Sequence, residues 1–389
     1  MMALTSFAVA FVLLGLALGD DRECVTSTAA NGHHGHCVTV ESCPYAYYVS
    51  GKCPSYGYDV KCCYSCHYGG CQTESSAGSV PGTESGEGTE NSTSLYADVR
   101  AAWLSRYDYP STQAELAQWF AQLKAKGINR VYPNVWGNGQ IYFHSQTFSS
   151  LGIRGFVQDV LRWAVEEGQK AGIEVWAWFE YGLMASWSSS PTVPAFSTAA
   201  YNRGWMKGEA NGYWWMDAGN TEVLDFLAGM MQDALDNYPG LAGVQLDDHF
   251  AQPSQLGTDL VLTMTNAARR ILGQVSGRVS FSPIVPTSLS VNGYNVDWVS
   301  WVKEDIGFHE YVPQIYRDNA PAFNLELDRV MLEVGKTKLV IGLRCNGSGA
   351  PTAYSELSQM LGRCETEGVG YSIWYSQCFT QLYTDLMLG

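Results

Sequence analysis

The sequence is poor in basic residues. It contains 23 Lys and Arg against 38 Asp and Glu, which gives a formal net charge of −15 and a pI of about 4.8. Nucleic acids and anionic membrane surfaces attract basic patches, so a chain of this charge is repelled by both. The composition therefore argues against nucleic-acid and membrane-surface partners, and it is compatible with neutral glycans.

Long hydrophobic runs are also scarce. The one marked hydrophobic run covers residues 7–18, which is too short to span a bilayer. At its end, Ala17-Leu18-Gly19 forms a small-x-small motif that is typical of a signal-peptide cleavage site. No other segment approaches a membrane span. We therefore expect residues 1–19 to be a signal peptide and the mature protein to be secreted, outside the cell or into a lumen of the secretory route.

Cysteine is abundant, but only near the N-terminus. A dense, even set after a signal peptide predicts a disulfide framework in residues 20–73, although nearby histidines leave a zinc site as the alternative. The eight cysteines are Cys24, Cys37, Cys43, Cys53, Cys62, Cys63, Cys66 and Cys71. The remaining three, Cys345, Cys364 and Cys378, are an odd number, and the sequence does not decide whether two of them pair.

Residues 74–94 contain almost no large apolar side chain and are rich in Gly, Ser, Thr and Glu, which predicts a flexible linker. Asn91 in this linker and Asn346 further along begin Asn-x-Ser/Thr sequons, so both are predicted glycosylation sites. The rest of the chain, residues 95–389, has the composition of a compact domain.

This last part alternates short apolar runs with amphipathic segments. The spacing predicts helices near 111–126, 155–171, 220–237, 258–274, 296–305, 322–334, 352–367 and 379–388. The expected strands are 99–104, 128–136, 173–180, 241–248, 278–283, 311–316, 338–343 and 369–375, with a long loop after the third. Eight strands, each followed by a helix, predict an α/β fold, a (β/α)₈ TIM barrel preceded by the small disulfide-rich module. An open doubly wound sheet is disfavoured because no Gly-rich phosphate loop follows the first strand.

In such barrels the chemistry lies where the strands end. The fourth expected strand ends in Asp247 and Asp248, and alternation along the strand places Asp247 on the same face as Gln245, toward the barrel interior. Two adjacent carboxylates raise each other's proton affinity. We predict Asp247 as the nucleophile or charged stabiliser of a reaction.

Glu180 ends the third expected strand, on the same face as two tryptophans. A carboxyl group beside aromatic rings can have a raised pKa, which suits a general acid. Glu180 or Asp248 is therefore the predicted acid/base, and the alternative for Glu180 is a simple ion pair with an arginine. Two carboxyl groups flanking a bond are what glycoside hydrolysis requires.

Other polar and aromatic residues are expected around the same mouth. The chain has 13 Trp and 23 Tyr, and sugar rings bind on aromatic faces. The predicted sugar-stacking residues are Trp136, Trp178, Trp374 and Tyr375, and the predicted hydroxyl-binding residues are Asn134, Asp217, Tyr316 and Arg317. The chemistry needs no metal and no cofactor.

The chain from about residue 100 to its end resembles the glycoside hydrolase-like family 10 proteins. The resemblance is carried by AAWLS (101–105), VYPNVWGNGQIYFHS (131–145), WAWFEYGLMA (176–185), GVQLDDHFAQPSQLG (243–257), VPQIYRDN (312–319) and GVGYSIWY (368–375). It implies a barrel with glycosidase action, in a family whose bacterial members cut cell-wall glycan strands. Asp247 and Asp248 match the paired aspartates of the family, Tyr316 and Arg317 match its Tyr-Arg, and Glu180 matches an acidic position that one branch has.

The core of the Cys-rich module, CPYAYYVSGKCPSYGYDVKCC, resembles small secreted modules that accompany enzymes attacking bacterial walls. Cys66 and Cys71 depart from the six-Cys pattern of those modules. Together the two resemblances imply a secreted glycosidase with a polysaccharide substrate, for which peptidoglycan glycan is favoured. The alternatives are a glycosidase for a storage or algal polysaccharide and a non-catalytic, lectin-like barrel.

Overall fold

The computed structural model describes residues 93–190, 192–347 and 351–379, and the backbone of three short strands near the N-terminus. The chain divides into a unit of residues 1–88 and a unit of residues 89–389. The N-terminal strands are β1 (Gly35–Thr39), β2 (Tyr48–Val49) and β3 (Val60–Tyr64), which form an antiparallel sheet in the order β1-β3-β2. The predicted signal peptide, the N-terminal disulfides, Asn91 and the last predicted helix lie outside the described residues, and the domain boundaries at 19, 73 and 94 stay predictions.

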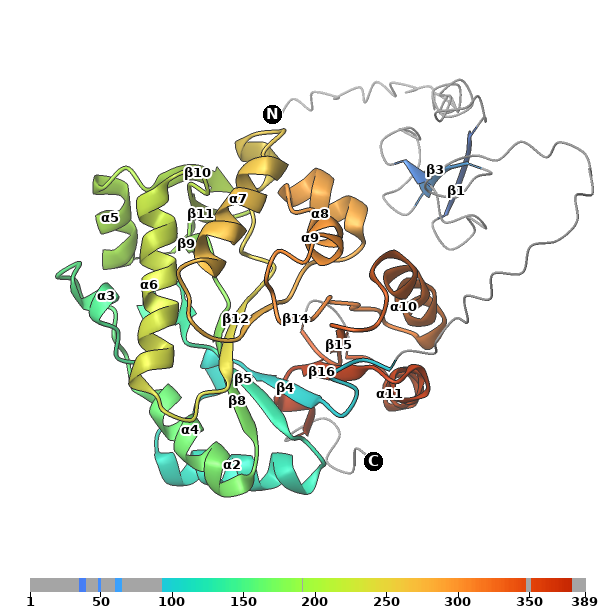
Figure 1. Ribbon diagram of the computed structural model, residues 1–389, viewed down its shortest axis with the longest axis horizontal. Coiled ribbons are helices and arrows are strands. Elements are labelled where there is room, and N and C mark those ends of the chain that lie inside the picture. The colour runs from blue at the N-terminus through green and yellow to red at the C-terminus, as the bar shows by residue number, and fades with distance from the viewer. Residues whose placement is uncertain are drawn as a thin grey trace, which may run out of the picture. The chain divides into compact units, whose positions relative to one another are not determined.

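The larger unit is a (β/α)₈ barrel, as the alternation of strands and helices predicts (Figure 1). Its strands are β4 (Arg100–Leu104), β5 (Arg130–Pro133), β8 (Glu174–Phe179), β12 (Gly243–Leu246), β13 (Val279–Phe281), β14 (Glu310–Tyr311), β15 (Val340–Arg344) and β16 (Gly370–Trp374). They form one parallel sheet in the order β14-β13-β12-β8-β5-β4-β16-β15. Two parallel bridges, Tyr311 to Leu339 and Gln314 to Gly342, join the ends of that order and close the barrel.

Helices surround the strands. They are α2 (Gln113–Ala125), α3 (Gln146–Ser149), α4 (Val160–Ala171), α6 (Thr221–Asn237), α7 (Val261–Leu272), α8 (Thr287–Tyr294), α9 (Trp298–Lys303), α10 (Ala320–Val334) and α11 (Tyr354–Glu367). Asn220 caps α6, and Thr112 caps α2, where Thr112 and Glu115 form a capping box. Helix α8 is not among the predicted helices, since its apolar spacing is weak. Within the described residues, no helix is long and apolar enough to cross a bilayer.

The segment between β8 and α6 is not the simple loop that the sequence predicts. It contains β9 (Met184–Trp187), helix α5 (Ala195–Asn202), β10 (Met206–Ala210) and β11 (Tyr213–Met216), and the strands form an antiparallel sheet in the order β10-β11-β9. We call this segment the inserted sheet. Shorter elements also border the strand ends, namely β6 (Trp136–Gly137), β7 (Gln140–Ile141) and the 3₁₀ turns η2 (Arg106–Asp108) and η3 (Ser254–Leu256).

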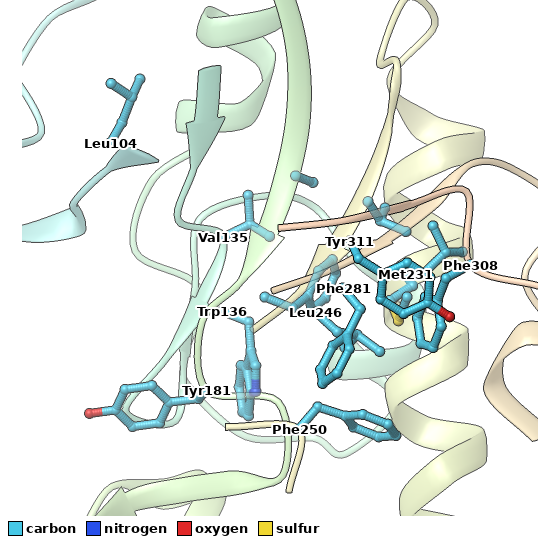
Figure 2. Packing of buried hydrophobic residues seen from close by; sticks show 14 of the residues in the cluster. Leu104, Val135, Trp136, Tyr181, Met231, Leu246, Phe250, Phe281, Phe308 and Tyr311 are labelled. Atoms are coloured by element: carbon cyan, nitrogen blue, oxygen red, sulfur yellow. The ribbon is translucent and has the colours of Figure 1, made fainter. Parts of the chain in front are cut away.

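Alternation along the strands sorts the core into two layers. Ala101 and Trp103 of β4 point into the barrel, where they pack with Tyr132, Trp176 and Trp178. The residues between them, Ala102 and Leu104, point outward and belong to the large cluster beneath the helices, part of which Figure 2 shows. The barrel interior is therefore filled with aromatic side chains, and an open site has room only above them, at the carboxyl ends of the strands.

Candidate active site

Asp247 directly follows β12 and points toward the barrel axis, the side that alternation predicts. Gln245 on the same face is fully buried and accepts a hydrogen bond from Trp103 Nε1 at 2.8 Å. Asp247 lies one step nearer the mouth, is 5% exposed, and accepts a hydrogen bond from Gln314 Nε2 on Oδ1 at 2.7 Å. The carboxyl group is thus almost enclosed while still reaching the surface of the mouth.

The surroundings of Asp247 favour its protonated form. Burial raises the pKa of Asp247 well above its ordinary value, and the negative charges of Asp248 and Glu180 raise it further. The backbone N–H of Asp248 and the indole of Trp178 act in the opposite direction and do not cancel the effect. Strands β12 and β8 are paired in parallel with Leu246 opposite Phe179, so Asp247 and Glu180 leave neighbouring strands at the same level.

Asp248 and His249 continue the chain along the rim of the mouth. The Asp248 side chain is 19% exposed, and its Oδ1 lies 3.5 Å from Nδ1 of His249. The same ring nitrogen lies 3.0 Å from the backbone oxygen of Glu180. One ligand atom each from Asp247, Asp248 and His249 lie within 4.8 Å of one another, so these three side chains are of a type and spacing that could contact one cation. The absence of a metal requirement stays a prediction.

Glu180 follows β8 and forms the ion pair that was the alternative to an acid role. Its Oε2 pairs with Nη1 of Arg106, whose side chain is only 4% exposed, and the same oxygen accepts a hydrogen bond from Asn134 Nδ2. Asn134 follows β5 and is 1% exposed. Its Oδ1 is buried and has no hydrogen-bond partner among the described residues.

Arg106 is the functional residue that the sequence analysis missed. It lies two residues beyond β4, and it packs against Tyr181 with the guanidinium 5.0 Å from the ring centroid. The negative charge of Glu180 raises the pKa of Arg106 above its ordinary value despite the opposing effect of burial, which is the largest single influence. Its place directly after a strand, in the AAWLSR segment, is the signal that could have found it.

Three of the four predicted stacking residues lie together. Trp178 is 1% exposed inside the barrel, so its ring offers no face to a sugar, contrary to the prediction; its centroid lies 5.4 Å from that of the partly exposed Trp374. Tyr375 follows with its centroid 5.0 Å from Trp374. Trp136, which Figure 2 labels, is fully buried among Phe148, Phe196 and Phe226, because the chain leaves the strand after Pro133 and turns into β6. The prediction that Trp136 stacks on a sugar is wrong.

Tyr316 is brought to the carboxylates, but Arg317 is not. Burial and the charges of Asp247 and Asp248 raise the pKa of Tyr316 well above its ordinary value, so its hydroxyl stays protonated near them. Arg317 instead pairs with Glu326 of α10 at 2.8 Å and donates to the Tyr316 backbone oxygen. The guanidinium therefore serves the helix–loop packing, contrary to the prediction that it orients sugar hydroxyls.

Asp217 is engaged within the inserted sheet and the loop after it. Its Oδ1 lies 3.4 Å from Nζ of Lys207 on β10 and accepts a hydrogen bond from the backbone N–H of Gly219 at 2.9 Å. Its side chain is 32% exposed and, among the described residues, forms no hydrogen bond or ion pair with Glu180 or Asp247. The contacts of Asp217 are therefore those of a loop-stabilising carboxylate.

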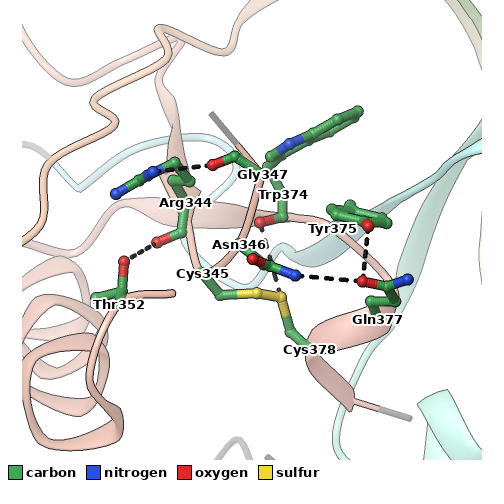
Figure 3. Close-up of a disulfide and its surroundings, with 9 residues drawn as sticks. All are labelled: Arg344, Cys345, Asn346, Gly347, Thr352, Trp374, Tyr375, Gln377 and Cys378. Atoms are coloured by element: carbon green, nitrogen blue, oxygen red, sulfur yellow. Dashed lines mark hydrogen bonds between the residues drawn. A yellow bond between two sulfur atoms is a disulfide. The ribbon is translucent and has the colours of Figure 1, made fainter. Parts of the chain in front are cut away.

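The loops after β15 and β16 form one wall of the mouth and are joined by a disulfide. Cys345 and Cys378 are paired, with their Cα atoms 6.2 Å apart, and Cys364 is buried and unpaired (Figure 3). This arrangement resolves the choice that the three cysteines left open. Within the wall, Tyr375 Oη donates to Gln377 Oε1 at 2.7 Å and Asn346 Nδ2 donates to the same oxygen at 3.2 Å.

A surface hollow of about 550 Å³ borders this wall. It is lined by Gln377, by Asp108 of the turn η2, and by Trp119 with polar side chains of α2. Burial raises the pKa of Asp108, and a hydrogen bond with Gln377 opposes that shift. The hollow lies beside the loops that carry Tyr375 and Arg106, and polar and aromatic side chains line it, as they line the mouth.

Comparison with known proteins agrees with this architecture. The barrel resembles the glycoside hydrolase domain of PgaB (BpsB) from Bordetella bronchiseptica, with a TM-score of 0.55, 11% identity, and coverage of 74% of this chain and 98% of that one. It also resembles a β-N-acetylhexosaminidase from Bacteroides fragilis, with a TM-score of 0.48, 11% identity, and coverage of 75% and 64%. No curated protein sequence matches the chain.

A family model gives the sequence-level assignment. The model described as Glycosyl hydrolase-like 10 matches residues 98–276, which run from the start of β4 to the end of the βα unit that carries Asp247. That stretch contains Arg106, Asn134 and Glu180 as well as the Asp247–Asp248 pair. Over residues 98–276, the barrel of this chain is therefore similar to the glycosyl hydrolase-like 10 family.

Proposed function

We propose that this protein is an O-glycosidase that hydrolyses a β-linked polysaccharide, with bacterial cell-wall glycan as the favoured substrate. The observation that carries the proposal is that Asp247, Asp248 and Glu180 follow the neighbouring strands β12 and β8 at the same level, where burial raises the pKa of Asp247. Glycoside hydrolysis needs one carboxyl group that holds a proton and a second that stays charged. Aromatic rings beside them, Trp374 and Tyr375, provide surfaces for sugar rings.

The electrostatics support a division of roles that reverses the one predicted from the sequence. Asp247 keeps its proton because it is buried beside two carboxylates, so it is suited to donate that proton to the glycosidic oxygen as the C–O bond breaks. Glu180, paired with Arg106 and Asn134, is suited to face the positive charge that develops on the sugar. A water molecule then supplies the hydroxyl group at the anomeric carbon, and its second proton restores the acid.

The relatives support the reaction class, and other features support the substrate and location. The similar PgaB (BpsB) domain is a glycoside hydrolase domain, and the matching family model is described as glycosyl hydrolase-like. The resemblance of the Cys-rich module to wall-attacking secreted proteins favours peptidoglycan. We also propose secretion, which the apolar run at residues 7–18 and the Cys345–Cys378 disulfide support.

The direct test is release of reducing ends from purified peptidoglycan, with a storage polysaccharide and an algal polysaccharide in parallel. We expect Asp247→Asn to lose at least about a hundredfold in kcat, the usual scale of a general acid. The matched control is Asp217→Asn, since Asp217 is a carboxylate bound within the inserted sheet. Hydrolysis of the storage or the algal polysaccharide alone would show that peptidoglycan is not the substrate. Binding of a glycan without release of any product would favour the lectin-like alternative.

A further inference from the structure

Tyr107, in the turn η2, is exposed and yet held in place. Its residue is 69% exposed, which for a single aromatic residue is ordinary and needs no explanation. What is unusual is its anchor: Nη2 of Arg106 donates a hydrogen bond to its hydroxyl at 2.6 Å, and the guanidinium lies 4.4 Å from its ring centroid. A buried cation thus fixes both the face and the tip of an exposed ring.

The same guanidinium reaches Glu180. Arg106 pairs with Glu180, packs on Tyr181 with the guanidinium 5.0 Å from the ring centroid, and binds Tyr107. We call these four residues the Arg106 group. Because one planar side chain contacts all of the other three, the position of the Tyr107 ring is tied to that of the Glu180 carboxylate.

A second ring lies next to this group. Tyr213 of the inserted sheet packs edge-to-face on Tyr181, with centroids 6.2 Å apart and an interplanar angle of 89°. Burial is the main cause that raises the pKa of Tyr213. Tyr107 and Tyr213 are thus each linked to Tyr181 or Arg106 of the same group, Tyr107 through the guanidinium and Tyr213 through the Tyr181 ring.

We propose that Tyr107 is a sugar-binding platform, held ready by Arg106, for the sugar ring next to the one that Glu180 contacts. The inference rests on the proposed glycosidase function and adds a residue that determines affinity for the substrate. The apolar face of a pyranose ring packs on an aromatic face, and a ring already fixed by its neighbours loses little conformational entropy on binding. Exposure leaves the outer face of Tyr107 open to such a sugar.

The competing explanation is that Tyr107 only shields Arg106. In that case the ring would act through the Arg106–Glu180 pair, and its removal would change kcat and leave affinity unchanged. A platform behaves differently, because it contacts the sugar in the ground state and in the transition state alike. Its loss raises KM and the dissociation constant of an oligosaccharide, with kcat kept.

The test uses the full chain with Tyr107→Ala and Tyr107→Phe, and with Tyr201→Ala as a control. Tyr201 is 71% exposed on α5 and is not part of the Arg106 group. Turnover is measured on peptide-free cell-wall glycan strands. Binding of the tetramer of β-1,4-linked N-acetylglucosamine is measured by calorimetry in the Asp247→Asn background, so that it does not depend on catalysis.

We expect Tyr107→Ala to raise KM and the tetramer dissociation constant about tenfold, which is ~1.4 kcal/mol. Tyr107→Phe keeps the ring, so its KM and dissociation constant should stay within about threefold of those of the parent protein. Both constants of Tyr201→Ala should equal those of the parent protein. Unchanged binding in Tyr107→Ala, or a loss of kcat with KM retained, would overturn the inference. Wild-type protein that binds the tetramer through Tyr107 but releases no product would leave the inference standing and overturn the proposed catalysis.

Discussion

At the scale of single residues, Asp247 carries a property that costs stability. A carboxyl group whose folded-state pKa is raised keeps a proton that the unfolded chain releases above about pH 4. Stability is therefore full below that pH and falls as the pH rises toward the folded-state pKa. Residues that trade stability for reactivity in this way are typical of active sites.

Asp247→Asn should for this reason stabilise the protein at pH 7.5 while it abolishes activity. The amide keeps an acceptor for Gln314 but carries no charge to be desolvated beside Asp248. We expect a melting temperature higher by about 2 °C or more at pH 7.5, and a smaller difference at pH 4. Scanning calorimetry at both pH values measures the melting temperatures of the variant and the parent protein. An equal change in melting temperature at the two pH values, or a decrease at pH 7.5, would contradict the raised pKa.

Asp248 should set the pH range of the reaction. Its negative charge is the second-largest cause that raises the pKa of Asp247, after burial. In Asp248→Asn the pKa of Asp247 falls, so the acid loses its proton earlier. The alkaline limb of the kcat/KM profile should then move to lower pH.

The control for this profile is Asp217→Asn, which removes a carboxylate that the structure places against Lys207. Its alkaline limb should coincide with that of the wild type. A limb that stays in place in Asp248→Asn would show that Asp247 is not the group that titrates in catalysis.

At the scale of elements, the disulfide fastens the two loops of one wall to each other. Cys345 directly follows β15, and Cys378 lies four residues beyond β16 (Figure 3). Trp374, Tyr375 and Gln377 belong to the segment that it restrains. The cross-link therefore supports the position of aromatic residues in the mouth as well as the fold.

Removing that cross-link should lower both stability and affinity. For the double variant Cys345→Ser/Cys378→Ser we expect a loss of about 3 kcal/mol in the free energy of unfolding, from the restraint on a loop of 33 residues. KM should rise because the Tyr375 wall is released. Denaturant titration and steady-state kinetics measure the two effects.

Cys364→Ala is the matched control, since Cys364 is buried in α11 and forms no disulfide. Burial raises the pKa of the Cys364 thiol, so it should also resist alkylation in the native protein. A double serine variant as stable as the control would contradict a supporting role for the cross-link.

At the scale of the whole molecule, charged residues join opposite sides of the barrel beneath the aromatic layers. Arg130 of β5 pairs with Glu310 of β14 at 2.6 Å, and their side chains are 5% and 0% exposed. Tyr132 donates to Glu310 at 2.9 Å, and Glu174 of β8 pairs with Arg130 at 2.6 Å. This network lies at the amino ends of the strands, where barrels place features for stability.

Glu310→Gln should destabilise the entire barrel without touching the mouth. It removes one charge of a buried pair and leaves Arg130 only partly compensated by Glu174, which we expect to cost about 3 kcal/mol. Denaturant unfolding followed by tryptophan fluorescence measures this. Glu304→Gln, at a surface pair with Arg269, is the control and should change stability by less than ~1 kcal/mol; equal effects would show that burial of the pair is unimportant.

The sequence by itself determined the fold and the central carboxylates. The spacing of apolar residues along the sequence predicted all eight strands of the barrel. The alternation of side chains along a strand predicted that Asp247 faces the interior, because strand geometry is local and regular. Two of its failures arise where the chain leaves regular strand geometry. The chain leaves the strand after Pro133, which places Trp136 in the outer core. Arg317 lies in a loop, and its ion pair with Glu326 depends on a tertiary contact that the spacing of apolar residues does not predict.

Only the tertiary structure decided which charges meet. Arg106 and Glu180 are separated by 74 residues, and the sequence contains no feature that ties the turn after one strand to the end of another. The choice of Cys345 and Cys378 as the bonded pair depends in the same way on adjacent strands of the closed barrel. Burial and neighbouring charge, which set the protonation of Asp247, are properties of the assembled mouth. The role that we propose for each carboxyl group therefore follows from closure of the barrel and not from residue type.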